Sequence, residues 1–190
     1  GQYHLSRSQS LYQSKQYGLS IIEAETAARL SPDDLKVQEI LVGLHSMFLR
    51  LDLGEKSVER FMALIKDDDK LKSRGYQELG DIEVLRGHMK KAKEFYEKAK
   101  ALGDINGIAK ATLDEFPENI DSTKQLPLNP DMLFVNPAEA LNRKGEIFAH
   151  FGMYQRALGI YSIILRIDPT NLTALLNTAT AKYKKEKYNR

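Results

Sequence analysis

Apolar residues recur three or four positions apart along most of the chain, and this spacing predicts amphipathic helices. Val37, Leu41 and Leu44, for example, share one face of a helix. Polar turns that contain proline separate such stretches, at Pro32 and again at Pro169. Proline stops one helix, and a polar residue beside it can cap the next. The pattern therefore predicts an all-helical chain.

The stretch Leu141–Pro169 contains two such helices with a small residue in each, Gly145 and Ala157. Small residues at a helix crossing let the two backbones approach closely, while aromatic side chains fill the neighbouring holes. A single helix pair cannot bury its own apolar face. The stretch therefore predicts further copies of itself along the chain.

A second copy lies at 73–106. Four of its residues recur, each 65 positions further on, as the pairs Gly80 and Gly145, Gly87 and Gly152, Ala92 and Ala157, and Tyr96 and Tyr161. This spacing resembles the tetratricopeptide repeat (TPR) pattern W-x2-L-G-x2-Y…A-x3-F…P. The resemblance implies an all-α fold, a right-handed superhelical array of antiparallel helix pairs with about four to five repeats. Glu83 departs from the pattern, which has an aromatic residue there, so the packing at that position must differ.

The resemblance divides one domain, 1–190, into repeats and one insertion. The repeats are predicted at 1–34, 35–72, 73–106 and 138–171, with a partial copy at 172–190 and an irregular insertion at 107–137. The second unit is longer than the 34 residues typical of the family. We expect the excess in a longer first helix or in the turn at Leu53-Gly54.

The insertion contains four of the six prolines of the chain, so it cannot form a helix pair of ordinary length. A short helix is predicted at Ile108–Phe116. The apolar residues that follow are expected to pack on the scaffold. A further hypothesis is that 117–137 lies in the binding groove as an internal mimic of the partner.

Composition narrows the class of protein. Lys+Arg 28 against Asp+Glu 26 gives a net charge of +2, too balanced for a nucleic-acid or membrane-surface binder. Without cysteine, disulfides and thiolate metal sites are excluded. No apolar run reaches the length of a membrane span, and the first residues lack the apolar core of a signal peptide, which favours a cytoplasmic location. Because the sequence does not begin with Met, we expect a fragment of a longer chain.

The residue types of known catalytic or metal sites do not assemble into a motif. None of the four histidines lies three or four residues from another, so no helical face offers a metal pair. The run Asp67-Asp68-Asp69 lacks the alternation of a calcium loop and indicates a solvated helix end. We therefore expect no cofactor, no metal and no catalysis.

Proteins similar to this one bind peptides or helices of partner proteins in a concave groove lined by the first helix of each pair. The cationic clamp that binds chaperone tails is absent, because Leu5 and Gln9 occupy its first positions. A mixed acidic and apolar groove suits an amphipathic helix or a mildly basic peptide instead. The predicted groove residues are Tyr12, Met47, Gln77, Asp81, Val84, Asn142, Glu146, Leu176, Thr180 and Tyr183.

The leading hypothesis is thus a protein-interaction scaffold with a protein or peptide partner. One alternative is the regulatory or output arm of a larger signalling protein, such as a bacterial response regulator. Another is a self-assembling oligomerisation module. The last helix, which begins at Leu172, has no second helix to cover it, and such a face invites pairing into a homodimer.

Overall fold

The structure is a computed structural model that describes residues 1–104, 106–118 and 133–188. These residues form helices and no strand. The helices are α1 (Gln2–Gln13), α2 (Tyr17–Leu30), α3 (Leu35–Met47), α4 (Leu51–Leu64), α5 (Asp69–Arg86), α6 (Met89–Ala101), α7 (Ile108–Asp114), α8 (Pro137–His150), α9 (Tyr154–Ile167) and α10 (Leu172–Tyr188).

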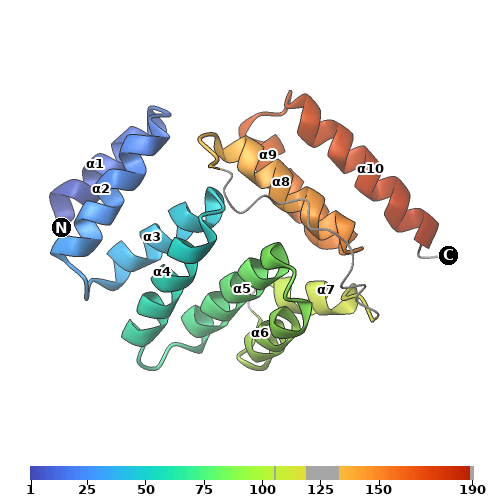
Figure 1. Ribbon diagram of the computed structural model, residues 1–190, viewed down its shortest axis with the longest axis horizontal. Coiled ribbons are helices and arrows are strands. Elements are labelled where there is room, and N and C mark those ends of the chain that lie inside the picture. The colour runs from blue at the N-terminus through green and yellow to red at the C-terminus, as the bar shows by residue number, and fades with distance from the viewer. Residues whose placement is uncertain (105, 119–132, 189–190) are drawn as a thin grey trace.

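Consecutive helices pack as antiparallel hairpins, because turns of a few residues join them. The hairpins are α1/α2, α3/α4, α5/α6 and α8/α9, and α10 packs on α9 as the first half of a further pair (Figure 1). The first three hairpins contact one another through their second helices, since α2 contacts α3 and α4 contacts α5. The chain is thus all-helical and built of stacked helix pairs, as predicted. None of the described helices is both long enough and apolar enough to cross a bilayer.

Side-chain caps and glycines set the ends of the first helices. Asp34, Asp68 and Asn136 each accept backbone N–H bonds at the start of α3, α5 and α8. Gly87 and Gly152 have φ values of 80° and 84° in the turns that follow α5 and α8. These are left-handed conformations, which glycine adopts without steric cost. The recurrence of these two glycines therefore reflects a repeated turn.

The extra length of the second repeat lies elsewhere than expected. Helix α3 has 13 residues, and Leu53 and Gly54 lie inside α4 rather than in a turn. It is α5 that is long, with 18 residues, because the Asp68 side chain caps it one turn earlier. The acidic run is the start of α5.

Each of the two hairpins that best match the repeat pattern, α5/α6 and α8/α9, is closed by a tyrosine that packs on a glycine. Tyr96 and Tyr161 are buried, at 0% and 2% exposure. A Cβ added at Gly80 would lie 2.8 Å from Cε1 of Tyr96, and one at Gly145 would lie 2.2 Å from Cε1 of Tyr161. A larger residue would overlap the ring, so glycine is required by the packing at both positions.

The fourth hairpin, α8/α9, comes after the third along the chain and also packs back on earlier helices. Helix α8 contacts α5 and α3, and the short helix α7, packed on α6, reaches α9 (Figure 1). One continuous core consequently extends from α5 through α10. Phe134, just before α8, is buried in it. Most of 117–137, the segment predicted to mimic a partner in the groove, lies outside the described residues.

Candidate partner-binding surface

Four of the predicted groove residues are buried. They lie on α5 and α8 and are Gln77, Asp81, Val84 and Asn142. Helix α8 packs on α5 at this place. Val84 is 0% exposed and belongs to the core. The predicted groove is therefore not open along α5, and Val84 and Asp81 are not surface residues.

Three of the predicted groove residues, Tyr12, Met47 and Gln77, form hydrogen bonds that link one helix to another part of the fold. The Tyr12 hydroxyl donates to Sδ of Met47 at 2.9 Å, which joins α1 to α3. Nε2 of Gln77 donates to Oδ1 of Asp104 at 3.1 Å. Asp104 in turn accepts from the backbone N–H groups of Ala109 and Lys110 at the start of α7. Gln77 thus links α5 to the turn from which α7 begins.

Asp81 is the centre of a buried ion cluster. Its Oδ2 lies 2.5 Å from Nζ of Lys144 and 2.6 Å from a guanidinium nitrogen of Arg156, and the Tyr96 hydroxyl donates to Oδ1 at 2.7 Å. Burial alone would raise the pKa of Asp81, but Arg156 and Lys144 hold it below its ordinary value. Asp81 therefore remains ionised and joins α5 to α6, α8 and α9.

An open hollow lies between α8 and α10, the first helices of consecutive pairs. A cavity of about 290 Å³ occupies its upstream half, and one of about 240 Å³ its downstream half, and Glu146 lines both. We call the two together the α8–α10 groove. Its upstream lining is Phe134, Asn136, Ala138, Glu139, Asn142, Arg143, Glu146, Asn171 and Thr173. Its downstream lining is Glu146, Ala149, His150, Tyr161, Asn177, Thr180, Ala181 and Lys184.

A chain of hydrogen-bonded polar side chains runs along this groove. Nδ2 of Asn142 donates to Oδ1 of Asn171 at 3.4 Å, and Nδ2 of Asn177 donates to Oδ1 of Asn142 at 3.3 Å. Asn177 also donates to Glu146 at 3.2 Å, and Arg143 donates to Glu146 at 2.9 Å. The predicted residues Asn142 and Glu146 are thus joined in one network on the groove floor.

Tyr161 borders the downstream half of the groove. Burial, reinforced by the nearby carboxylate of Glu146, raises the pKa of its hydroxyl well above the ordinary value. The hydroxyl therefore stays protonated and able to donate a hydrogen bond at neutral pH. Thr180 lies on the same wall and is exposed.

Asn171 and Asn177 line the groove but were not among the residues predicted from the sequence. Asn171 was recognisable as a cap, and its Oδ1 does accept from the backbone N–H of Ala174 at 3.0 Å. Its second role, toward Asn142, depends on the packing of α8 on α10. The predicted residues Leu176 and Tyr183 do not line the groove. They are both 66% exposed and lie on another face of α10.

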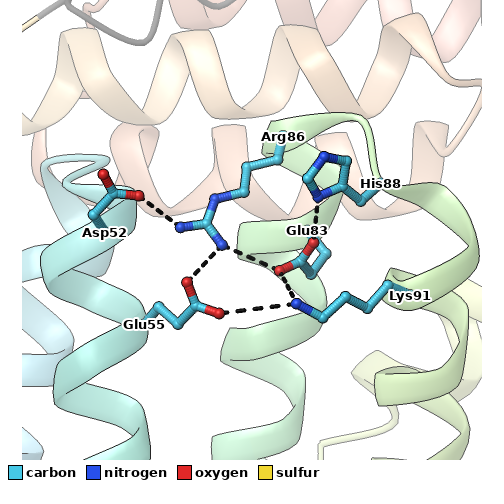
Figure 2. A network of polar contacts seen from close by, with 6 residues as sticks. All are labelled: Asp52, Glu55, Glu83, Arg86, His88 and Lys91. Carbon is cyan, nitrogen blue, oxygen red and sulfur yellow. Dashed lines mark hydrogen bonds and ion pairs between the residues drawn. The ribbon is translucent and has the colours of Figure 1, made fainter.

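A second polar cluster occupies the place of the missing aromatic residue at Glu83 (Figure 2). Glu83 is 1% exposed and contacts Arg86 at 3.1 Å, His88 at 2.7 Å and Lys91 at 2.9 Å. Arg86 extends the cluster to Glu55 on α4 at 2.7 Å. As predicted, the packing here differs from the pattern, since ion pairs replace a ring.

The electrostatics of this cluster favour its charged form. Burial alone would raise the pKa of Glu83, but hydrogen bonds from Lys91 and His88 lower it overall. Among the described residues, no group of three or more His, Asp and Glu side chains could hold a metal ion. The ion pairs of the cluster link α4, α5 and α6.

Comparison with known proteins gives structural neighbours only. No protein-family model matches the sequence, and no curated protein matches it. Two crystal structures of MamA have TM-scores of 0.46, at 13% and 14% identity. They cover 97% and 96% of this chain, and 82% and 96% of their own.

A third neighbour is YrrB, described as a TPR protein with an unusual peptide-binding site. Its TM-score is 0.43 at 14% identity, over 96% of this chain and 76% of its own. In the present structure, antiparallel hairpins stack in series, and a tyrosine packs on a glycine in two of them. By this architecture, the chain has a TPR-like helical-repeat fold.

Proposed function

We propose that the chain is a protein-interaction scaffold that binds an extended peptide segment of a partner protein in the α8–α10 groove and acts by binding, without catalysis. The observation that carries the proposal is the chain of amide side chains Asn171, Asn142 and Asn177 along the groove floor. Each amide offers both a donor and an acceptor, as a peptide group does. A bound backbone can therefore exchange hydrogen bonds with the groove without leaving polar groups unpaired.

The lining of the groove favours an extended segment over an amphipathic helix. Its alanines, such as Ala138 and Ala149, offer little apolar surface for a large anchor to contact, and Phe134 is largely covered. A helix needs such anchors, because its backbone groups are already bonded to each other. An extended strand presents its backbone instead.

Charge sets the preferred side chains of the partner. Glu139 is exposed at the upstream rim, and Glu146 lies at the middle of the groove, where Arg143 already pairs with it. An acidic peptide would meet these carboxylates, whereas Lys184 lines only the downstream half, so a neutral or mildly basic segment fits the upstream half and the middle better. The interpretation as a regulatory arm of a signalling protein stays a prediction, since nothing in the groove bears on it.

The test begins with selection of phage-displayed peptides on the chain, followed by fluorescence anisotropy with the tightest binder. Replacing Asn142 and Asn177 together by Ala removes two backbone-directed hydrogen bonds of about 1 kcal/mol each, so binding should weaken by about 10- to 30-fold. Asn106→Ala, in an exposed turn outside the groove, is the matched control and should bind like the wild type.

Circular dichroism checks that each variant keeps its helices. The proposal is wrong if the double variant, fully folded, binds the selected peptide as tightly as the Asn106→Ala control does. Selection of strongly acidic peptides would refute the charge argument separately.

A further inference from the structure

Helix α10 exposes a row of large apolar side chains. The exposed fractions are 78% for Leu172, 44% for Leu175, 66% for Leu176 and 66% for Tyr183. With the exposed Ala179 they recur at three- and four-residue intervals and so share one face of the helix. We call Leu172, Leu175, Leu176, Ala179 and Tyr183 the α10 stripe. Ala174 and Ala181, on the opposite side, are buried against α9 and α8.

The preceding repeat shows that a helix covers the corresponding face of α8. In α8, Leu141 and Gly145 are buried, α9 packs antiparallel on this helix, and Tyr161 of α9 lies against Gly145. Leu175 and Ala179 stand 34 residues later, in the same repeat positions. In α10 this side carries no described helix, and small Ala179 lies among larger side chains as Gly145 does. The stripe therefore presents a surface on which one antiparallel helix can pack.

The charges along α10 are unevenly distributed. Between Leu172 and Ala181 there is no charged residue, whereas Lys182, Lys184, Lys185 and Lys187 follow with only Glu186 between them. Lys184 lines the groove, and Lys185 donates to Gln155 on α9. Lys182 and Lys187 are exposed and flank the end of the stripe on either side, and exposed Glu186, three residues after Tyr183, lies between them on the same face. The stripe is thus apolar in its first half, and its second half carries two lysines against one glutamate, a net positive charge.

We propose that the α10 stripe docks an amphipathic helix of a partner protein, antiparallel to α10, with acidic residues in its first two turns and an apolar face after them. The antiparallel direction places the acidic turns beside Lys182 and Lys187 and the apolar face on Leu172 and Leu176. Acidic residues also stabilise the N-terminus of the incoming helix itself. This surface is separate from the α8–α10 groove and takes a different class of ligand.

A second copy of the chain fits the charges less well. Two α10 helices side by side in parallel would bring lysines against lysines. In the antiparallel arrangement, the lysines of each copy would face the uncharged half of the other and remain uncompensated. An acidic partner helix neutralises them in one orientation only.

The probe is a fluorescent synthetic peptide of about 20 residues, long enough for a stable helix, with Glu in its first two turns and Leu at helical spacing. A matched peptide carries Lys in place of each Glu. Anisotropy with the full chain should show the acidic peptide binding at least about tenfold tighter than the basic one, with a gap that narrows as salt rises. Binding of both peptides with equal affinity, or of neither, overturns the proposal.

Variants locate the site. Leu172→Gln combined with Leu176→Gln should weaken the acidic peptide by about tenfold or more, because anchors at the centre of an interface dominate affinity. Leu30→Gln, which changes another exposed leucine, on α2, is the control and should have no effect. Alanine at Asn142 and Asn177 should also leave this binding unchanged, which separates the stripe from the proposed groove function.

Sedimentation velocity completes the design. The proposal expects the chain alone to sediment as a monomer. A dimer that dissociates in the Leu172 and Leu176 double variant would show that a second copy covers the stripe, and would overturn the partner assignment.

Discussion

Gly145→Ala is a direct test of how the fourth hairpin is closed. The new Cβ would lie 2.2, 2.7 and 2.9 Å from three ring atoms of Tyr161, whereas ordinary contact begins at 3.4 Å. The ring would have to move by about 1.2 Å, but Tyr161 is 2% exposed and enclosed by the core. Overpacking of this kind costs about 1–3 kcal/mol.

The same substitution also improves helix propensity, by about 1 kcal/mol for alanine over glycine. The net change at Gly145 is therefore a destabilisation of up to about 2 kcal/mol. Gly159→Ala provides the matched control, because Gly159 lies inside α9, is exposed, and has no atom within 4 Å of an added Cβ. Gly159→Ala gains the higher helix propensity of alanine without a steric clash and should stabilise the protein by up to about 1 kcal/mol.

Urea unfolding followed by circular dichroism at the helix band measures both variants against the wild type. The difference between them, about 1–3 kcal/mol, isolates the steric cost. In a Tyr161→Leu background the ring is absent, and Gly145→Ala should become neutral or stabilising. If Gly145→Ala stabilises the wild type as much as Gly159→Ala does, Tyr161 does not pack on Gly145 and the hairpin geometry is wrong.

Three further predictions concern the core and its charges. Asp81→Asn should destabilise the fold by about 3–5 kcal/mol in thermal or urea unfolding, because it leaves Lys144 and Arg156 buried without their counter-ion. Ala157→Leu, at a fully buried helix crossing, should cost about 1–3 kcal/mol in the same assay. Burial lowers the pKa of His45, so below its unfolded value of about 6.5 the unfolded state binds more protons. The free energy of unfolding should thus fall as the pH drops from 7 to 5, and His45→Gln should reduce that slope.

Controls exist for each of the three. Asp114→Asn removes an exposed carboxylate paired with Lys110 and should change stability little, so an equal effect at Asp81 would contradict the buried cluster. Ala101→Leu, at an exposed helix position, should be tolerated, and a neutral Ala157→Leu would argue against close approach of α8 and α9. An unchanged pH slope in His45→Gln would show that other groups cause it.

The repeat itself was predictable because its signals are local. Gly80 and Tyr96 lie within one hairpin, and their spacing is fixed by the helices and the turn between them. The packing of α8 on α5 was not predictable, because Asp81 and Lys144 come from distant parts of the chain and ion pairs impose no sequence period. The predicted groove therefore ran along α5, where α8 in fact covers it. Only its later portion, around Glu146, lies in the open groove.

The ion cluster at Asp81 also bears on how the molecule comes apart. In a simple repeat array each unit touches only its neighbours, and units can unfold one after another. Here Asp81 is bonded at once to α6, α8 and α9, so α5 to α9 should open as a single cooperative block. The first hairpin packs chiefly on α3 and is free of this constraint. Hydrogen exchange should accordingly be fastest in α1 and α2, and the amides of α5 to α9 should exchange together.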